Sequence, residues 1–266
     1  MHLVSISIRP APVLYNWNWW IELCVLVQIL FHWSAQIYYW SILVQIYYSF
    51  DTATVTGSTL LNLGSRGAPY NAQLINSPAI STSDKMVGTG AIQFTSSLSQ
   101  YVQIPSLTTG TSGLSFAFWF KFAETEDNSS IFDFGNGMNL DNILLTPSDI
   151  LCTDGSKRYR HNLLLRQFQA IGHNWIHVTW TINTGGTWEI YLNGSLYMSL
   201  AKAFYPGSMT RTLNYLGKSS WGWDPLLDGA IDDFYLFQHV LSPDQVQKLY
   251  NLGTNIDGSL LPLGQN

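Results

Sequence analysis

Two tryptophans and an aspartate stand close together in the stretch Trp221-Gly-Trp-Asp224. An exposed indole can stack on the apolar C–H face of a sugar ring, while a carboxylate accepts hydrogen bonds from sugar hydroxyl groups. Tyr205, in another connection marked by Gly and Pro, offers a further aromatic ring. We therefore predict a carbohydrate-binding site at Tyr205, Trp221, Trp223 and Asp224. The alternative is that both indoles fold back and seal one end of the domain.

Histidine and cysteine give only a weak metal signal. His173 and His177 share one face of a predicted strand with Trp175 between them, which would supply half of a zinc site. No further zinc ligands occur nearby in the sequence, so a structural role is expected for these histidines. The two cysteines, Cys24 and Cys152, lie far apart and establish neither a disulfide framework nor a CxxC metal motif.

The elements that would position these residues are β-strands. After Phe50 the sequence consists of short apolar or alternating runs separated by Gly, Ser, Thr, Asn and Pro, which is typical of an all-β sandwich or barrel. Within 114–122 every second residue is Leu or Phe, which predicts one core-facing side because side chains alternate across a strand. Trp119 falls on the opposite side. Candidate strands include 91–94, 101–104, 114–122, 130–134, 162–169, 175–183, 187–192 and 230–237.

Two local signals mark a hairpin and a helix. Asn193-Gly194 separates two apolar runs, which is a strong signal for a tight β-hairpin. The stretch 241–250 has a Ser cap, Pro at the first helical position, and Val246, Leu249 and Tyr250 at helical spacing. The sequence therefore predicts one short helix that closes the domain.

These segments, in this order, resemble the laminin-G-like jelly-roll family of the concanavalin-A-like lectin and glucanase superfamily, from about Tyr47 to Tyr250. The resemblance is carried by Tyr48-Ser-Phe-Asp51, Gly90-Ala-Ile-Gln-Phe94, Tyr101-Val-Gln-Ile-Pro105, Leu114-Ser-Phe-Ala-Phe-Trp-Phe120, Asn174-Trp-Ile-His-Val-Thr179, Ile190-Tyr-Leu-Asn-Gly194, Tyr215-Leu-Gly-Lys218 and Gly229-Ala-Ile-Asp-Asp-Phe-Tyr-Leu-Phe237. It implies an all-β fold, a two-sheet antiparallel jelly-roll sandwich with one short C-terminal helix. We divide the chain into an apolar, aromatic-rich N-terminal segment at 1–46, the jelly-roll domain at 47–252 and a tail at 253–266.

The resemblance also implies a candidate calcium site. Acidic residues at the opening strand and at the last long strand often help hold calcium in this family, and here they would be Asp51, Asp232 and Asp233. Calcium takes six to eight oxygen ligands, so turn carbonyls would complete the set. By alternation Asp232 shares a face with Phe234 and Leu236 and is expected to point inward. The alternative is that Asp232 only accepts backbone hydrogen bonds.

Nothing in the sequence favours catalysis. Glucan hydrolases of the superfamily use closely spaced carboxylates on one strand face. The stretch most similar to such a motif is Glu124-Thr-Glu-Asp-Asn128, and its polar composition predicts a solvated turn. We therefore expect a non-catalytic extracellular binding module that recognises carbohydrate through loop aromatics, with calcium as a structural ion. The alternative is a protein–protein adhesion module without sugar specificity. The expected partner is thus a glycan or a cell-surface or extracellular protein.

The N-terminal segment differs in composition from the rest of the chain. Residues 23–50 contain no Asp, Glu, Lys or Arg, so residues 21–46 could cross a membrane, although several Gln, His and Ser interrupt the run. A duplicated extension or extra strands are the alternatives. Arg9 before the run would keep the N-terminus inside, so we expect a secreted or membrane-anchored protein with the jelly roll outside the cell. The formal net charge of −5 argues against a nucleic-acid partner.

Overall fold

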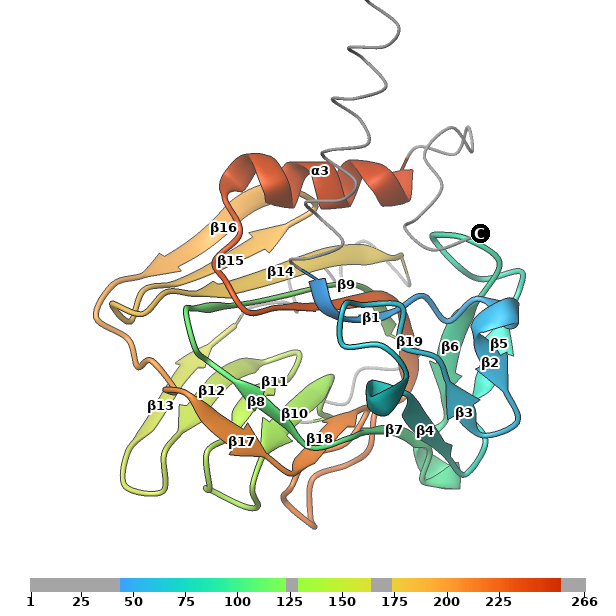
Figure 1. The fold of residues 1–266 in the computed structure, drawn as a ribbon, viewed down its shortest axis with the longest axis horizontal. Coiled ribbons are helices and arrows are strands. Elements are labelled where there is room, and N and C mark those ends of the chain that lie inside the picture. Colours follow the sequence, from blue (N-terminus) through green and yellow to red (C-terminus); the bar gives the residue numbers. More distant parts are fainter. Residues whose placement is uncertain (1–43, 123–128, 164–173, 255–266) are drawn as a thin grey trace, which may run out of the picture. The chain divides into compact units, whose positions relative to one another are not determined.

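The computed structural model of the protein describes residues 44–122, 129–163 and 174–254. Contacts divide the chain into two units, Met1–Trp40 and Ser41–Asn266, and all of the described residues belong to the second unit. They form two large β-sheets, a two-stranded sheet, one α-helix and short 3-10 helices (Figure 1). The 3-10 helices are η1 (Thr52–Thr54), η2 (Ala68–Tyr70) and η3 (Ser96–Leu98).

The first sheet has eight strands, seven of them in the order β16-β15-β14-β9-β19-β6-β5, while β1 also pairs with β19. Its strands are β1 (Val44–Tyr48), β5 (Ala79–Ser81), β6 (Ala91–Phe94), β9 (Leu114–Phe122), β14 (Ile176–Ile182), β15 (Trp188–Leu192), β16 (Ser195–Leu200) and β19 (Gly229–Phe237). All pairs are antiparallel. The first half of β19 pairs with β6 and the second half with β1, so these two strands share one edge of β19.

The second sheet has nine strands in the order β13-β12-β11-β10-β18-β7-β4-β3-β2. Its strands are β2 (Val55–Thr56), β3 (Thr59–Leu60), β4 (Ala72–Ile75), β7 (Tyr101–Ile104), β10 (Phe132–Gly135), β11 (Ile143–Leu145), β12 (Asp149–Thr153), β13 (Arg158–Asn162) and β18 (Leu213–Leu216). β8 (Leu107–Thr109) and β17 (Met209–Arg211) form the two-stranded sheet. The prediction of a two-sheet antiparallel jelly-roll sandwich with one short helix is confirmed.

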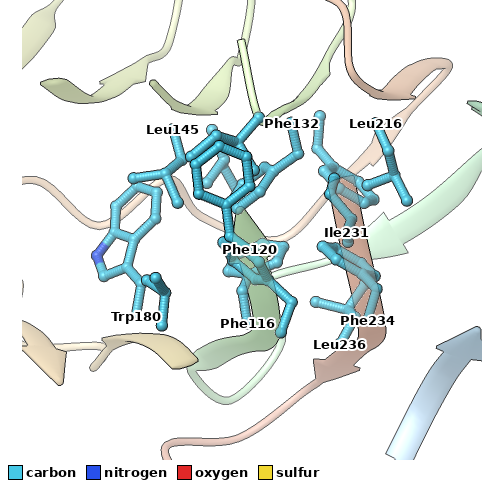
Figure 2. Close-up of a cluster of buried hydrophobic side chains, with 14 of the residues drawn as sticks. Phe116, Phe120, Phe132, Leu145, Trp180, Leu216, Ile231, Phe234 and Leu236 are labelled. Carbon is cyan, nitrogen blue, oxygen red and sulfur yellow. The ribbon is translucent and has the colours of Figure 1, made fainter. Parts of the chain in front are cut away.

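The core lies between the two large sheets. Leu114, Phe116, Phe118 and Phe120 all point into it from β9, as the alternation of that segment predicts. Figure 2 shows side chains of both sheets meeting there, and the rings of Phe116 on β9 and Phe132 on β10 are stacked with centroids 4.7 Å apart. Burial of these large aromatic side chains supplies the main favourable contribution to folding.

The outer face of the first sheet, turned away from the core, carries α3 (Pro243–Thr254) (Figure 1). Trp119 of β9 points to this face, and its ring lies 5.6 Å from that of Tyr250 on the helix. A Cβ atom on Gly253 would collide with the Trp119 indole, so the helix backbone rests directly on that ring. The absence of a side chain at Gly253 therefore permits this close approach.

The helix begins where the sequence predicts. Ser242 Oγ accepts a 3.3 Å hydrogen bond from the Gln245 N–H, and Gln245 Oε1 accepts one of 2.8 Å from the Ser242 N–H. This reciprocal pair is a capping box, which satisfies two donors that the start of a helix would otherwise leave free.

A β-bulge interrupts β19 at its two aspartates. Asp232 pairs with Trp119, but the next paired residue is Tyr235, opposite Ala117, so β19 has an extra residue here. Asp233 takes up the irregularity with a φ of 50°. The bulge reverses the alternation, so Asp232 lies on the outer face with Trp119 while Phe234 points into the core. The prediction that Asp232 shares a face with Phe234 and Leu236 is therefore wrong.

The predicted N-terminal segment ends inside a strand. Of its residues 1–46, only 44–46 are described, and they belong to β1, which starts before the predicted opening strand. Among the described residues, no helix is both long enough and apolar enough to cross a membrane. The predicted anchor at 21–46 otherwise lies outside the described residues, as does the predicted tail beyond Thr254.

Candidate functional site

The connection 217–228, between β18 and β19, lies on the outer face of the second sheet. Leu144 of β11 and Leu151 of β12 point to this face, because their neighbours along both strands belong to the core. Trp221 packs against these two leucines in a small apolar cluster and is only 6% exposed. The guanidinium carbon of Arg158 lies 6.0 Å from the centroid of the indole. Trp221 thus attaches the connection to the sheet.

A buried carboxylate fixes the start of the same connection. Asp133 lies on the outer face of β10, because Phe132 and Phe134 on either side of it point into the core. Its Oδ2 accepts a 2.7 Å hydrogen bond from the Ser220 N–H, and Asn142 Nδ2 donates to both carboxylate oxygens at 3.0 and 3.2 Å. Burial outweighs these hydrogen bonds and raises the pKa of Asp133 to about 6.

Asp133 is expected to make the free energy of unfolding depend on pH. Its pKa of about 6 in the folded protein lies above the value of about 3.9 for an unfolded aspartate. The stability that its protonation contributes is therefore fully present below about pH 4 and is lost as the pH rises through about 6, by at most ~1.4 kcal/mol per pH unit.

Urea unfolding at pH 4.5 and pH 7 measures this dependence in the wild type and in Asp133→Asn. The other titrating groups are common to both proteins, so the difference between the two profiles reports on Asp133. The wild type should lose more stability than the variant between these two pH values. Parallel profiles would contradict the raised pKa.

The connection exposes one of its two indoles. Trp223 is 73% exposed, the largest value among the large apolar side chains of the described residues. Its neighbour Asp224 is half-buried, and Asp224 Oδ2 accepts a 2.8 Å hydrogen bond from the Ser219 hydroxyl. The predicted site residues therefore separate, since Trp223 and Asp224 reach the surface while Trp221 is an anchor rather than an exposed ring.

Tyr205 has a different set of partners. Its hydroxyl donates to the Gly110 carbonyl at 2.5 Å and accepts a 3.0 Å hydrogen bond from the Gly113 N–H. These contacts join its connection to the turn between β8 and β9, and its ring packs against the core. The partners of Trp221 lie on β11 and β12, so Tyr205 and Trp221 are held by different elements.

The three aspartates predicted as metal ligands do come together. Asp51 follows β1, and Asp232 and Asp233 form the bulge of β19 at the point where its pairing changes from β6 to β1. All three carboxylates are buried, with exposures of 8%, 0% and 4%. Burial, followed by the charge of Asp233, raises the pKa of Asp232 well above its usual range, and burial raises that of Asp233 to about 7.

The connection between β5 and β6 closes over two of these carboxylates. Asp232 Oδ2 accepts hydrogen bonds of 2.8 and 2.9 Å from the N–H groups of Met86 and Val87. Asp51 Oδ1 accepts hydrogen bonds from the N–H and the hydroxyl of Thr89. Gly88 lies between them with a φ of 56°, and a Cβ atom there would collide with the Asp51 carboxylate. Only glycine therefore fits this close approach without strain.

Asp233 is turned toward two tyrosines. Its Oδ1 accepts a 2.9 Å hydrogen bond from the Tyr47 hydroxyl, and its Oδ2 accepts one of 3.2 Å from the Tyr235 hydroxyl. The two rings are stacked with centroids 4.3 Å apart. Both oxygens of Asp233 thus have donors within the protein.

The carboxylate cluster has two deficits that a cation would remove. Asp232 Oδ1 is buried without a hydrogen-bond partner. The ion pairs within the described ranges join Lys121 to Asp84 and Arg160 to Asp149, so none of the three aspartates has a basic ion-pair partner there. In the same ranges, however, no group of three or more His, Cys, Asp or Glu side chains is arranged to hold a metal ion. A cation would therefore depend on two carboxylates, Asp51 and Asp232, and on main-chain oxygens.

His177 is buried on β14 opposite Trp119, which separates it from Asp232 in the same row of the first sheet. Its ring lies 5.1 Å from that of Trp119 and 6.0 Å from that of Tyr250, and burial lowers its pKa to about 3. A neutral imidazole packed between aromatic rings agrees with the structural role expected for it. His173 and the acidic stretch 124–128 lie outside the described residues.

Known proteins resemble this chain in sequence and in fold. The sushi, von Willebrand factor type A, EGF and pentraxin domain-containing protein 1 of Rattus norvegicus is 28% identical over 159 residues, which are 56% of this chain and 4% of that protein. This chain therefore corresponds to only a small part of that relative.

Two solved structures share the fold at low sequence identity. Domain 4 of AbnA, a GH43 extracellular arabinanase from Geobacillus stearothermophilus, solved in complex with arabinotriose, matches with a TM-score of 0.59 and 19% identity, over 78% of this chain and 98% of that one. The binding domain of botulinum neurotoxin serotype D/C matches with a TM-score of 0.59 and 17% identity, over 81% of this chain and 53% of that one. These likenesses show a common fold.

The family assignment rests on sequence and fold together. Residues 95–247, more than half of the chain, match the family model described as the concanavalin A-like lectin/glucanases superfamily. The two antiparallel sheets and the closing helix have the architecture that the resemblance implies. The chain belongs to the laminin-G-like family of the concanavalin A-like lectin/glucanases superfamily.

Proposed function

We propose that the protein is a non-catalytic extracellular module that binds carbohydrate at the outer face of the second sheet, with Trp223 as the stacking ring. The observation that carries this proposal is an exposed indole on an anchored connection. Trp223 is 73% exposed, while the connection is held by the buried Trp221 and by the hydrogen bond from Ser220 to Asp133. A connection that is held in place loses little backbone freedom on binding, which favours affinity.

The relatives support a binding role by analogy. The AbnA domain was solved with arabinotriose bound, and the neurotoxin domain is described as a binding domain. The rat relative carries EGF and pentraxin domains in its name, and the arabinanase is extracellular. A fold can host unrelated functions, so the exposed ring and not the fold is the basis of the sugar proposal.

We also propose a structural calcium ion at Asp51 and Asp232. The unpartnered Oδ1 of Asp232 and the proximity of three buried carboxyl groups without a basic ion-pair partner in the described residues support it. Such an ion would hold the end of β1, the bulge of β19 and the connection over Gly88 together. Its effect would be on stability, since this cluster is on the first sheet and the Trp223 connection is on the second.

Titration against a panel of soluble oligosaccharides tests the sugar proposal. Trp223→Ala is expected to weaken binding by at least about tenfold, since it removes a stacking face. Leu196→Ala is the matched control, because Leu196 is also exposed, at 55%, but lies on β16 of the first sheet. Equal affinities of Trp223→Ala and the wild type for every sugar bound would contradict the proposal.

The alternative function is protein adhesion without sugar specificity. It is favoured by β13, an edge strand of the second sheet whose five residues are all exposed. Exposed edges can pair with an extended segment of another chain. An oligosaccharide panel without any binding, together with saturable capture of a purified partner that depends on β13, would favour this alternative.

A further inference from the structure

Among the described residues, nothing covers one half of the outer face of the second sheet. The strand registers align Gln73 of β4 with Gln103 of β7, and Gln103 with Tyr215 of β18. Gln73 is exposed and Gln103 is half-exposed. The row continues from Tyr215 through Asp133 of β10 to Leu144 of β11. There the connection 217–228 covers the sheet, because its Trp221 packs on Leu144. The face therefore consists of a covered half, under Trp221, and an open half over β4, β7 and β18.

Two phenol rings and one ammonium group meet on the open half. The rings of Tyr101 and Tyr215 are edge-to-face with centroids 5.6 Å apart. Lys218, at the start of the connection, places its Nζ 4.4 Å from the centroid of Tyr101 and 4.8 Å from that of Tyr215. Attraction between the cation and the electron-rich ring faces holds the ammonium group in place.

The polar ends of these side chains are available to a ligand. Within the described residues, no side-chain hydrogen bond joins Gln103, Tyr101, Tyr215 or Lys218 to another protein group. Lys218 is absent from both ion pairs of the described ranges. Two carboxylates of this face already have partners: that of Asp133 is buried and bonded to Ser220 and Asn142, and that of Asp224 accepts a hydrogen bond from Ser219. Within the described ranges, the open half thus offers amide and hydroxyl groups around an ammonium group that forms no ion pair.

We propose that Tyr101, Tyr215 and Lys218 bind the acidic group of a sugar chain, with the ring edges and Gln103 contacting its hydroxyl groups. This inference rests on the proposed function and names the ligand class of the same face, namely a glycan bearing a carboxylate or sulfate. A point charge such as an ammonium group does not distinguish the two anions by geometry, whereas a neutral sugar leaves it without a partner. Trp223 supplies stacking to either kind of sugar, and Lys218 supplies the preference for the acidic kind.

Titration with three hexasaccharide preparations tests the proposal. Hyaluronan carries a carboxylate, chondroitin 4-sulfate carries a carboxylate and a sulfate, and carboxyl-reduced hyaluronan carries neither. Lys218→Gln is expected to weaken binding of the two acidic probes about tenfold, the size of a lost charged hydrogen bond, and to leave the neutral probe unaffected. Lys218→Arg keeps the charge and should retain most of the affinity. Lys248→Gln is the matched control, because Lys248 lies on α3, which packs on the first sheet.

The outcomes separate this inference from the proposed function. Weaker binding of acidic probes by Lys218→Gln alone, at an unchanged melting temperature, supports the inference, and a larger loss for chondroitin sulfate than for hyaluronan identifies sulfate as the preferred anion. Equal binding of hyaluronan and its reduced form by the wild type overturns the inference, while a loss with Trp223→Ala in the same experiment leaves the proposed function standing. No binding of any of the three probes by the wild type overturns the inference, and the wider oligosaccharide panel then decides the proposed function.

Discussion

Calcium is expected to raise the melting temperature of the wild-type protein, and Asp232→Asn is expected to abolish that rise. The buried Oδ1 of Asp232 has no hydrogen-bond partner, and no basic side chain of the described residues pairs with Asp51, Asp232 or Asp233. A bound cation would satisfy both deficits only in the folded state. At a free calcium concentration about a hundredfold above Kd, this adds about 2.7 kcal/mol to the free energy of unfolding, or roughly 5–10 °C for a domain of this size.

Thermal melts in calcium and in a chelator measure the effect, and isothermal titration gives the stoichiometry. In the chelator Asp232→Asn should be at least as stable as the wild type, because it removes the repulsion between Asp232 and Asp233. Asp228→Asn is the control, since Asp228 lies one residue before β19 and should respond to calcium like the wild type. A wild type with equal melting temperatures in both buffers, or a responsive Asp232→Asn, would rule out the site.

The strands and the helix follow from local patterns that the sequence displays directly. Every second residue of β9 is Leu or Phe, and the structure buries four of them in the core between the sheets. Ser242 and Gln245 stand at capping-box spacing, and the structure shows both hydrogen bonds of that motif. Such signals depend on neighbours within a few residues, so one sequence is sufficient to read them.

The bulge in β19 is the point where alternation fails. Strict alternation puts Asp232 and Phe234 on the same face, but an extra residue at Asp233 places them on opposite faces. The cause is long-range, since β6 and β1 share one edge of β19 and meet at these aspartates. The chain alone gives no sign of where that change of partner occurs. The grouping of Asp51 with the two aspartates came instead from the family resemblance.

Local sequence patterns also could not predict which residues meet on the outer face of the second sheet. Asp133 could have been noticed, because a carboxylate between Phe132 and Phe134 must face away from the core. Its partner Ser220 is far along the chain, so the hydrogen bond that anchors the connection could not be foreseen. Tyr101 and Lys218 meet for the same reason, through the pairing of β7 with β18.

Trp221→Ala is expected to lower the free energy of unfolding by about 3 kcal/mol, whereas Trp223→Ala should change it by less than about 0.5 kcal/mol. The two indoles are two residues apart, yet Trp221 is 6% exposed and Trp223 is 73% exposed. Removing Trp221 exposes Leu144 and Leu151 and removes the ring beneath Arg158. Removing Trp223 takes away a side chain that already faces water. Urea unfolding of both variants at pH 7 measures the difference.

Trp221→Phe distinguishes an anchor from a general packing defect. Phenylalanine keeps an apolar ring over Leu144 and Leu151, so this variant should recover most of the lost stability and, with the connection reattached, most of the sugar affinity. Trp221→Ala should lose both, because Trp223 stacks well only while its connection is held against the sheet. A Trp221→Ala protein that is as stable as the wild type would show that Trp221 does not anchor the connection. Loss of sugar binding in that stable protein would instead place Trp221 in direct contact with the ligand.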